Sequence, residues 1–343
     1  MPSSSSDRDR PRSAAAVPLE PADRRSALNL AVAALALLAI VLAWPVPRGL
    51  ARLTSLRRAP RASLVLWQAS AVAAVLAALL AAPAALLSLV EATAGSVAGT
   101  RSILTPGDVV LWPAPIAATV TGVVAARLLF AGDRVGRRLR AARRRHRDLI
   151  DLLAVDGGHD TPDNHRMRVL EHRTPTAYCV PGLARRVVVT RGTLDSLSAI
   201  ELRAVLAHER AHLIARHDLV LEFFTVMHEA VPRFVRSDQA LHSVTLLIEV
   251  LADRAAVRSV GVIATGRAIV AMVGAPRPEG ALGMSGIGTA SVSDARQRIE
   301  LLEGGRVFSL PNAIASGLMY TAAGLLVTAP VALLFAAVPA ASN

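Results

Sequence analysis

Two histidines and a glutamate stand at a spacing that suits metal-dependent chemistry. The stretch reads His208-Glu209-Arg210-Ala211-His212, in a segment dominated by residues that favour helix. Four residues make about one helical turn, so His208 and His212 project from the same face. Two imidazoles at this spacing can supply two ligands of a tetrahedral zinc ion. Glu209 can then accept a proton from a zinc-bound water molecule.

The residues around this motif predict that its helix is buried. Ser198 and Glu201 have the spacing of a capping box, which marks the start of a helix. Apolar residues along the helix place it in a core: Leu202, Val205, Leu206 and Leu213. Burial of three ionisable side chains is costly unless they are paired or ligated. The five-residue pattern also arises by chance on helix surfaces, so a third ligand is needed to decide.

The best candidate for the third protein ligand is Glu249. It lies in an apolar segment with Asp253 one helical turn further on, so both carboxylates share one face. We expect Glu249 to bind the metal and Asp253 to accept a hydrogen bond from a ligand imidazole. Asp218 is the rival, because it follows His212 by six residues. That spacing, however, needs a glycine after the helix, and position 215 is Ala.

Other side chains carry weaker expectations. Cys179 is the only cysteine, which excludes an intrachain disulfide. We expect it to be a small buried residue, with a role as thiolate ligand as the alternative. Tyr178 and Arg296 are candidates for stabilising an oxyanion.

Composition indicates a membrane protein. The chain of 343 residues is 53% hydrophobic and only 3% aromatic, which is too apolar for an ordinary soluble protein. The fold class that we predict is mainly α: a polytopic membrane protein with about four transmembrane helices. Apolar runs mark these spans at residues 27–44, 64–90, 109–130 and 313–338. In the second run we expect a break near Pro83.

Charge sets the expected orientation. All 38 basic residues are Arg, and they cluster after the first span and after the third. Basic loops stay in the cytoplasm, so the segment between the third and fourth spans should be cytoplasmic. Arginines between residues 134 and 147 form a dense run, which we interpret as an anchor against anionic lipid. A nucleic-acid-binding patch is the alternative. We prefer the lipid anchor because the run directly follows a span, so no direct nucleic-acid binding is expected.

The chain therefore divides into four parts. We predict a disordered arm at 1–26, three transmembrane helices at 27–131, a catalytic domain of zincin-like α+β type at 132–312, and a fourth span with a short tail at 313–343. In the third part, we predict strands at residues 167–171 and 186–190. We predict helices at residues 219–231, 243–257 and 295–302. Residues 156–164 and 273–292 are predicted to be loops. The composition of the second indicates only flexibility and does not decide whether it is a gate or a self-cleavage site.

Several segments together resemble the BlaR/MecR-type membrane metallopeptidases, which are gluzincin-like. They are HERAHLIARHD at 208–218, EVLADRAAV at 249–257, the strand–turn–helix entry at 187–209 and ARQRIELL at 295–302. The resemblance covers residues 178–302 and the order of three spans before the domain and one after it. It implies one zinc ion per chain and a cytoplasmic catalytic domain. It also implies cleavage of a BlaI/MecI-like transcriptional repressor in a signalling pathway.

One departure and two alternatives accompany this resemblance. Members that sense beta-lactams carry a large sensor domain after the last span, and the chain ends too soon for us to expect one. A second enzyme reading is an HtpX-like protease for the quality control of membrane proteins. A third reading is a membrane sensor or scaffold without catalytic activity, although such a protein would have no need of Glu209.

Overall fold

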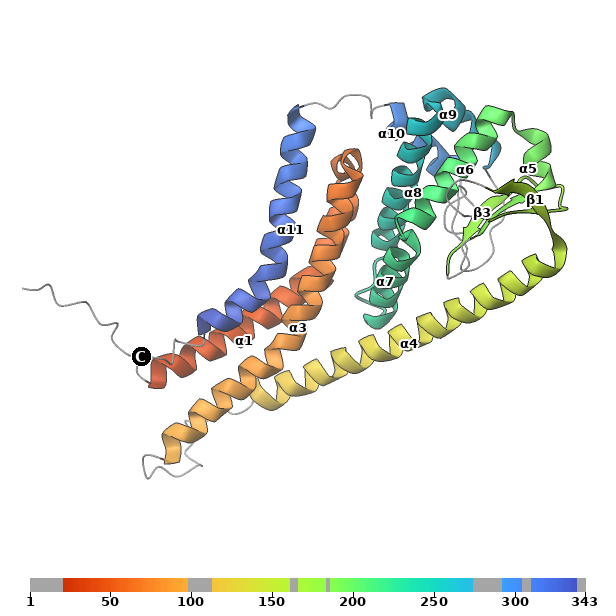
Figure 1. Cartoon of the computed structure of the whole chain (residues 1–343). Helices are drawn as coiled ribbons and strands as arrows, with labels where there is room; N and C mark the ends of the chain where they lie inside the picture. Colours follow the sequence, from red (N-terminus) through yellow and green to blue (C-terminus); the bar gives the residue numbers. More distant parts are fainter. Residues whose placement is uncertain are drawn as a thin grey trace, which may run out of the picture.

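The computed structural model describes residues 21–97, 113–160, 166–182, 186–273, 292–303 and 310–337. Most of these residues are helical, and a single small sheet lies beside the helices of the domain that precedes the last helix (Figure 1). The predicted loop at 273–292, most of the N-terminal arm and most of the loop at 91–108 lie outside the described residues. Residues 21–26 of the arm are helical.

Within the described residues, four helices are long and apolar enough to cross a membrane, and the first of these candidate spans continues beyond α1 to Arg52. They are α1 (Pro21–Ala43), α3 (Pro60–Val97), α4 (Pro113–Leu153) and α11 (Leu310–Ala337). The sheet and the remaining long helices lie between α4 and α11 in the chain. The predicted fold class, with about four spans and a catalytic domain inserted before the last, is therefore confirmed.

Two of these helices differ from the prediction. The helix α3 runs through Pro83 without ending there. The helix α4 does not stop at the end of its apolar run but continues for 41 residues through the arginine-rich segment to Leu153. Arginine is a good helix former, so the change from apolar to basic residues alters the surroundings of the helix and not its backbone. One rigid element thus joins the third span to the sheet.

Between the first two spans, a short linker packs against the catalytic domain. It contains α2 (Pro45–Arg52) and the 3-10 helix η1 (Thr54–Arg58). Leu50 of α2 packs on the main hydrophobic core, and Leu64 and Trp67 of α3 are buried members of that same core. The predicted boundary between spans and catalytic domain therefore separates elements that share one core.

The sheet has four strands in the order β1-β2-β4-β3. They are β1 (Ala154–Asp160), β2 (Arg166–Leu170), β3 (Ala177–Val180) and β4 (Arg186–Thr190). The strand β2 is parallel to β4, and the other two pairs are antiparallel. The expected strand at 186–190 is found with the same bounds, and that at 167–171 begins and ends one residue earlier. The strand β1 replaces a predicted loop, and β3 was not predicted.

The helices of the domain begin and end at recognisable signals. They are α5 (Arg191–Ser196), α6 (Ala199–Ile214), α7 (His217–Ala230), α8 (Asp238–Val260), α9 (Val262–Ala271) and α10 (Val292–Glu303). Ser198 and Glu201 form the capping box that the sequence predicts for α6. Arg216 adopts a left-handed conformation, with φ of 52°, and turns the chain from α6 into α7.

The two faces of the sheet pack on different partners. Cys179 of β3 and Val189 of β4 belong to the main core, together with Val205 of α6 and Ile248 of α8. On the opposite face, Tyr178 packs in a smaller cluster with Ile150 of α4. The sheet is thus held between the end of the long membrane helix and the helix that carries the histidine motif.

Gly192 is the position where the packing leaves no room for a side chain. A Cβ atom there would lie 1.9 Å from the carbonyl oxygen of Arg173. We predict that Gly192→Ala destabilises the protein by about 1–3 kcal/mol, because the backbone must move to relieve the overlap. Gly266, inside α9, has nothing within 4 Å of the same atom and serves as the control.

For Gly266→Ala we expect a gain of up to about 1 kcal/mol, since alanine is the better helix former. Thermal unfolding of both purified variants in detergent measures the difference. Equal midpoints for the two variants would contradict the packing around Gly192.

Candidate active site

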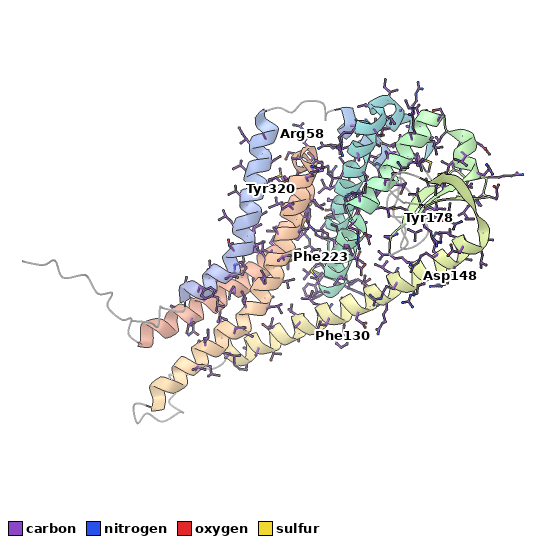
Figure 2. The ribbon with its side chains drawn as sticks, viewed as in Figure 1. Arg58, Phe130, Asp148, Tyr178, Phe223 and Tyr320 are labelled. Atoms are coloured by element: carbon purple, nitrogen blue, oxygen red, sulfur yellow. The ribbon has the colours of Figure 1, made fainter. Side chains whose placement is uncertain are left out.

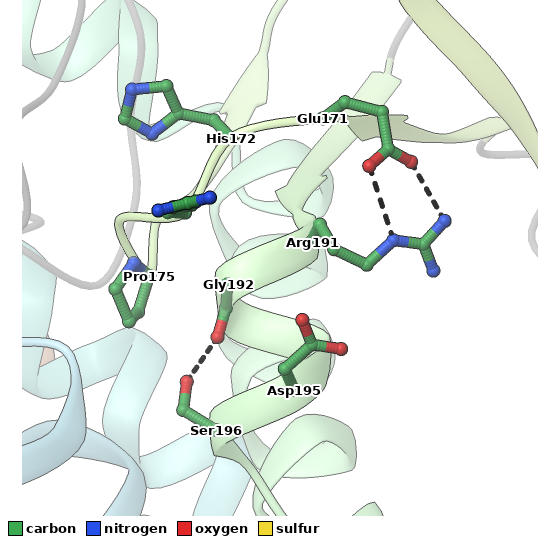
Figure 3. Close-up of a pocket in the computed structure, with 8 residues that line it drawn as sticks. Glu171, His172, Pro175, Arg191, Gly192, Asp195 and Ser196 are labelled. Carbon is green, nitrogen blue, oxygen red and sulfur yellow. Dashed lines mark hydrogen bonds and ion pairs between the residues drawn. The ribbon is translucent and has the colours of Figure 1, made fainter.

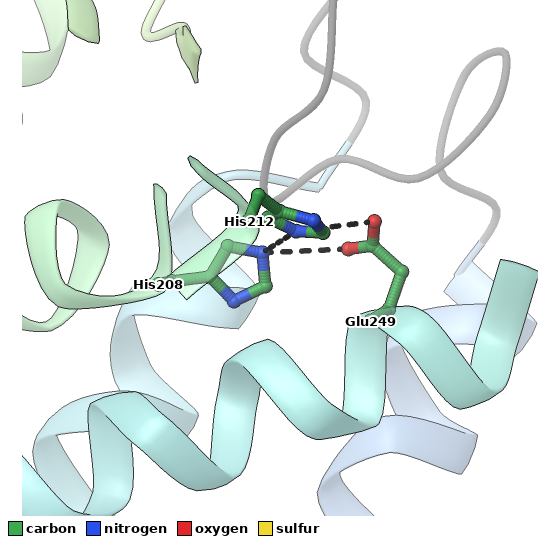
Figure 4. A group of neighbouring side chains, drawn as sticks. All are labelled: His208, His212 and Glu249. Carbon is green, nitrogen blue, oxygen red and sulfur yellow. Dashed lines mark hydrogen bonds and ion pairs between the residues drawn. The ribbon is translucent and has the colours of Figure 1, made fainter. Parts of the chain in front are cut away.

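Three buried side chains from two helices point to one small space (Figure 4). His208 and His212 lie on α6, and Glu249 lies on α8, which packs against α6. The Nε2 atoms of the two histidines are 3.0 Å apart. The Glu249 carboxylate lies 3.5 Å from the Nε2 atom of His208 and 3.6 Å from that of His212.

These distances suit a tetrahedral zinc ion. With zinc–ligand bonds of about 2.0–2.1 Å, neighbouring ligand atoms of a tetrahedron are about 3.4 Å apart. The 3.0 Å between the two Nε2 atoms is shorter than this value, while Oε2 of Glu249 lies 3.5 Å from His208 and Oε1 lies 3.6 Å from His212. The donor set of two imidazoles and one carboxylate leaves a fourth position for water, as in catalytic zinc sites.

Each histidine of the cluster has a partner on the nitrogen that faces away from the metal position. The Nδ1 atom of His208 lies 2.9 Å from Oδ1 of Asp253. The Nδ1 atom of His212 lies 3.0 Å from Nδ1 of His217. When each of these Nδ1 atoms carries the proton and donates it to its partner, both Nε2 atoms present lone pairs to each other and to a carboxylate. Such an arrangement calls for a cation.

Arg298 of α10 ties the two acidic side chains of α8 together. Its Nε atom donates to Oδ2 of Asp253 at 2.7 Å, and its Nη2 atom donates to Oδ1 at 2.5 Å. Its Nη1 atom lies 3.3 Å from Oε2 of Glu249. All three side chains are almost completely shielded from solvent. The bidentate geometry fixes Asp253 and thereby the ring of His208.

Electrostatics in the metal-free site keep the carboxylates charged. Burial alone would raise the pKa of Glu249 and Asp253, but His208 and Arg298 outweigh it and lower each pKa to about 2. Burial lowers the pKa of His208, whereas Asp253 and Glu249 raise it to a net value of about 9. Burial lowers the pKa of His217 to about 4, so this ring is neutral at pH 7.

Glu209 is fully buried beside the cluster. It follows His208 on α6, and its negative charge raises the pKa of Arg298 together with the charges of Asp253 and Glu249. Its place on the inner face of α6, shared with the two histidines, is compatible with the role of proton acceptor that the motif indicates.

The other predicted candidates point elsewhere. Asp218 lies 3.8 Å from Arg143 and 3.6 Å from Arg216, and it is not part of the cluster. Cys179 is buried in the main core and is likewise not in the cluster. Tyr178 faces the other side of the sheet, where its hydroxyl lies 2.7 Å from Nε2 of His146.

Sequence reasoning missed Arg298 and gave no role to His217. Arg296, the arginine considered for the site, is exposed and pairs with Glu300 on its own helix. Position 298 shares a helical face with Ala295 and Leu302, both buried, and this periodicity was the signal that could have marked it. His217 gave no such signal, because its approach to His212 depends on the left-handed turn at Arg216.

A surface pocket of about 560 Å³ lies away from the histidine cluster and shares no residue with it (Figure 3). Its wall includes Gly192, Asp195 and Pro175, together with the ion pair of Glu171 and Arg191. Its charged lining residues and its wide opening do not resemble an enclosed apolar ligand site.

Together, four membrane-spanning helices and a buried His-His-Glu site define a membrane zinc metallopeptidase. Comparison with known families supports this class: residues 140–272 match the sequence profile of Peptidase family M48. The chain thus contains an M48 zinc metallopeptidase domain, and its cofactor is one zinc ion. No curated protein and no solved structure matches the chain.

The first prediction from the site concerns Arg298. Arg298→Met leaves two buried carboxylates without their common partner, so we expect a loss of stability of about 3–5 kcal/mol. Loss of this support of the ligands should also weaken zinc binding by about 10- to 100-fold. Competition with a chelator measures the affinity, and Arg296→Met is the matched control on the exposed face of α10.

The second prediction concerns the proton that His208 must release when zinc binds. A pKa of about 9 means that His208 is protonated in the metal-free protein at pH 7.5 and must lose that proton to bind zinc. Affinity should therefore rise about tenfold per pH unit up to pH 9. Calorimetry in two buffers with different ionisation enthalpies should detect about one released proton per zinc ion. Asp253→Asn should reduce that number, and no release in the unaltered protein would contradict the arrangement.

Proposed function

We propose that the chain is a membrane-bound zinc endopeptidase in which His208, His212 and Glu249 hold the metal and Glu209 is the catalytic base. The observation that carries the proposal is the convergence of the two imidazoles and the carboxylate, with ligand atoms all within 4.8 Å of one another. The match to Peptidase family M48 over residues 140–272 supports the reaction type.

A zinc ion held by His208, His212 and Glu249 would lower the pKa of a water molecule and polarise the scissile carbonyl. Glu209 is placed to accept a proton from the attacking water and to deliver it to the leaving amine nitrogen, so one peptide bond breaks for one water consumed. Asp253 accepts the Nδ1 proton of His208 and keeps its Nε2 lone pair directed at the metal position. Arg298 holds Asp253 in place for this task.

We further propose the division of the chain that the sequence predicts, with the catalytic domain at 132–312 and inside the cytoplasm. The family match at 140–272 and the delivery of Arg298 by α10 support these bounds. The orientation rests on the arginines, which follow the first and third spans and are scarce between the second and third. The exposed arginines at the start of the run on α4, such as Arg134 and Arg137, then face anionic lipid of the inner leaflet, whereas Arg143 pairs with Asp218 and Glu222.

An extended peptide is the substrate form that such a site accepts most readily. The strand β4, which comes shortly before the motif helix in the chain, lies between β2 and β3 and is already paired on both sides. The strand β3 is at the end of the sheet nearer to the motif, since it packs on α6. All four residues of β3 are buried, so a peptide could pair with this strand only after a rearrangement that uncovers its edge.

For the substrate itself, we propose a cytoplasmic repressor of the BlaI/MecI type, and the support is the resemblance of the segments at 208–218 and 249–257. A second candidate is an HtpX-like role in cleaving damaged membrane proteins. The observation that favours it is the shared core, in which Leu64 and Trp67 of the second membrane helix pack within the catalytic domain. A substrate in the same bilayer would lie close to such a site.

Cleavage assays can separate these two candidates. Purified enzyme in lipid nanodiscs would be given a soluble winged-helix repressor and, separately, an unfolded membrane protein in the same disc. A single cut in the repressor with no cut in the membrane protein supports signalling. Multiple cuts in the membrane protein alone support quality control.

The base assignment gives a direct prediction. Glu209→Gln should keep zinc at one ion per chain and lower the cleavage rate by at least about 10²- to 10⁴-fold, since proton transfer is lost. Glu201→Gln is the matched control on the same helix, because glutamine preserves the capping box and activity should stay unchanged. Cleavage by a zinc-loaded Glu209→Gln enzyme at the rate of the control would disprove the role.

A further inference from the structure

The turn between α7 and α8, residues 231–237, carries an aromatic side chain at its tip. Phe234 is 79% exposed, and the neighbouring Arg233 is exposed as well. Arg236 braces the turn from within, by donating to the carbonyl oxygens of Val231 and Glu229 at 3.2 and 3.0 Å. The chain thus holds a large apolar side chain outward on a rigid turn. A single exposed aromatic residue is common on protein surfaces, so its neighbours decide what it means.

The end of the first membrane helix is one neighbour of this turn. Arg48 of α2 donates to the carbonyl oxygens of Phe234 and Arg236, at 3.4 and 3.0 Å. The same guanidinium donates to the carbonyl oxygen of Trp44 at 2.9 Å and lies 5.9 Å from the centre of its ring. Trp44, at the end of α1, is 50% exposed. One arginine therefore fixes the turn beside the junction of α1 and α2, in the last part of the candidate span Ala27–Arg52.

The third membrane helix is the other neighbour. The Nε atom of Arg127 donates to the carbonyl oxygen of Ala230, the last residue of α7, at 2.5 Å. Arg127 lies within the apolar part of α4, and Phe130 one turn further on is 74% exposed on the outer side of this helix (Figure 2). The lower end of α7 approaches α4 in the same region (Figure 1). The turn is therefore level with the end of the third apolar run.

We propose that the α7–α8 turn is a membrane-contact element of the catalytic domain, in which Phe234 inserts into the interfacial layer of the lipid bilayer. Trp44, Phe130 and Phe234 are held at one level by Arg48 and Arg127, and aromatic side chains concentrate at that layer in membrane proteins. Arg233, next to Phe234, lies where it meets lipid phosphate groups. The occupant of this surface is lipid because the surface continues directly from two candidate membrane spans.

Fluorescence in nanodiscs tests the proposal. The full chain would carry Phe234→Cys labelled with an environment-sensitive dye, in discs of mixed neutral and anionic phospholipid that hold a single chain. Asp195→Cys, on the exposed side of α5, is the matched control site. The native Cys179 is fully buried, so labelling of the unaltered protein gives the background. An unchanged zinc content verifies that each variant is folded.

The expected result is a blue-shifted emission at position 234 that spin-labelled lipids quench and aqueous iodide does not. The label at position 195 should behave in the opposite way. Equal quenching by iodide at both positions would place the turn in water and overturn the proposal. A blue shift at position 234 that appears only in discs with two chains would also overturn it, by identifying the occupant as a second copy. Neither readout depends on proteolytic activity.

Discussion

Glu209, Glu249 and Asp253 are buried within the same part of the molecule, and Arg298 is the cation that lies among them. With both imidazoles neutral, as zinc binding requires, three carboxylates and one guanidinium leave a formal charge of −2 in this buried region, and in the metal-free protein the proton on His208 offsets one of these charges. Such an excess is unstable unless a cation balances it, and zinc carries the charge of +2 that does so. Arg298 and the metal are therefore complementary: neither alone neutralises the site, and together they do.

This charge balance also explains how distant parts of the chain are joined. The carboxylates come from α6 and α8, whereas Arg298 comes from α10, which precedes the last membrane helix. On the opposite side, Arg143 of α4 lies 3.8 Å from Asp218, beside His217. Arg143 lies on the helix that continues from the third span, and Arg298 lies on the helix that precedes α11 in the chain. Through Arg143, the helix that contains the third span is thus linked to Asp218, which is next to the residue that contacts His212.

The local features of the site could be predicted from sequence, and the long-range ones could not. The motif at 208–212 lies on one short helix, and periodicity alone brings its two histidines to one face. The choice of Glu249 over Asp218 rested on an apolar segment. In the structure Glu249 lies in the metal cluster, while Asp218 turns to Arg143 and Arg216. Arg298 escaped notice because only the rotation of α10 distinguishes it from Arg296. The strand β1 escaped it because its seven residues include two glycines and two aspartates, which are uncommon in strands, and β3 because it has only four residues.

The length of α7 sets the distance between the metal cluster and the third span. Its first residue, His217, contacts a zinc ligand, and its last, Ala230, meets the third span, with 14 residues in between and including these ends. Such a helix is about 21 Å long. With Phe234 at the lipid surface, a polypeptide that emerges from the bilayer reaches the zinc after about six extended residues. Tails shorter than this would escape cleavage, so reach alone would set a minimum size for membrane-anchored substrates.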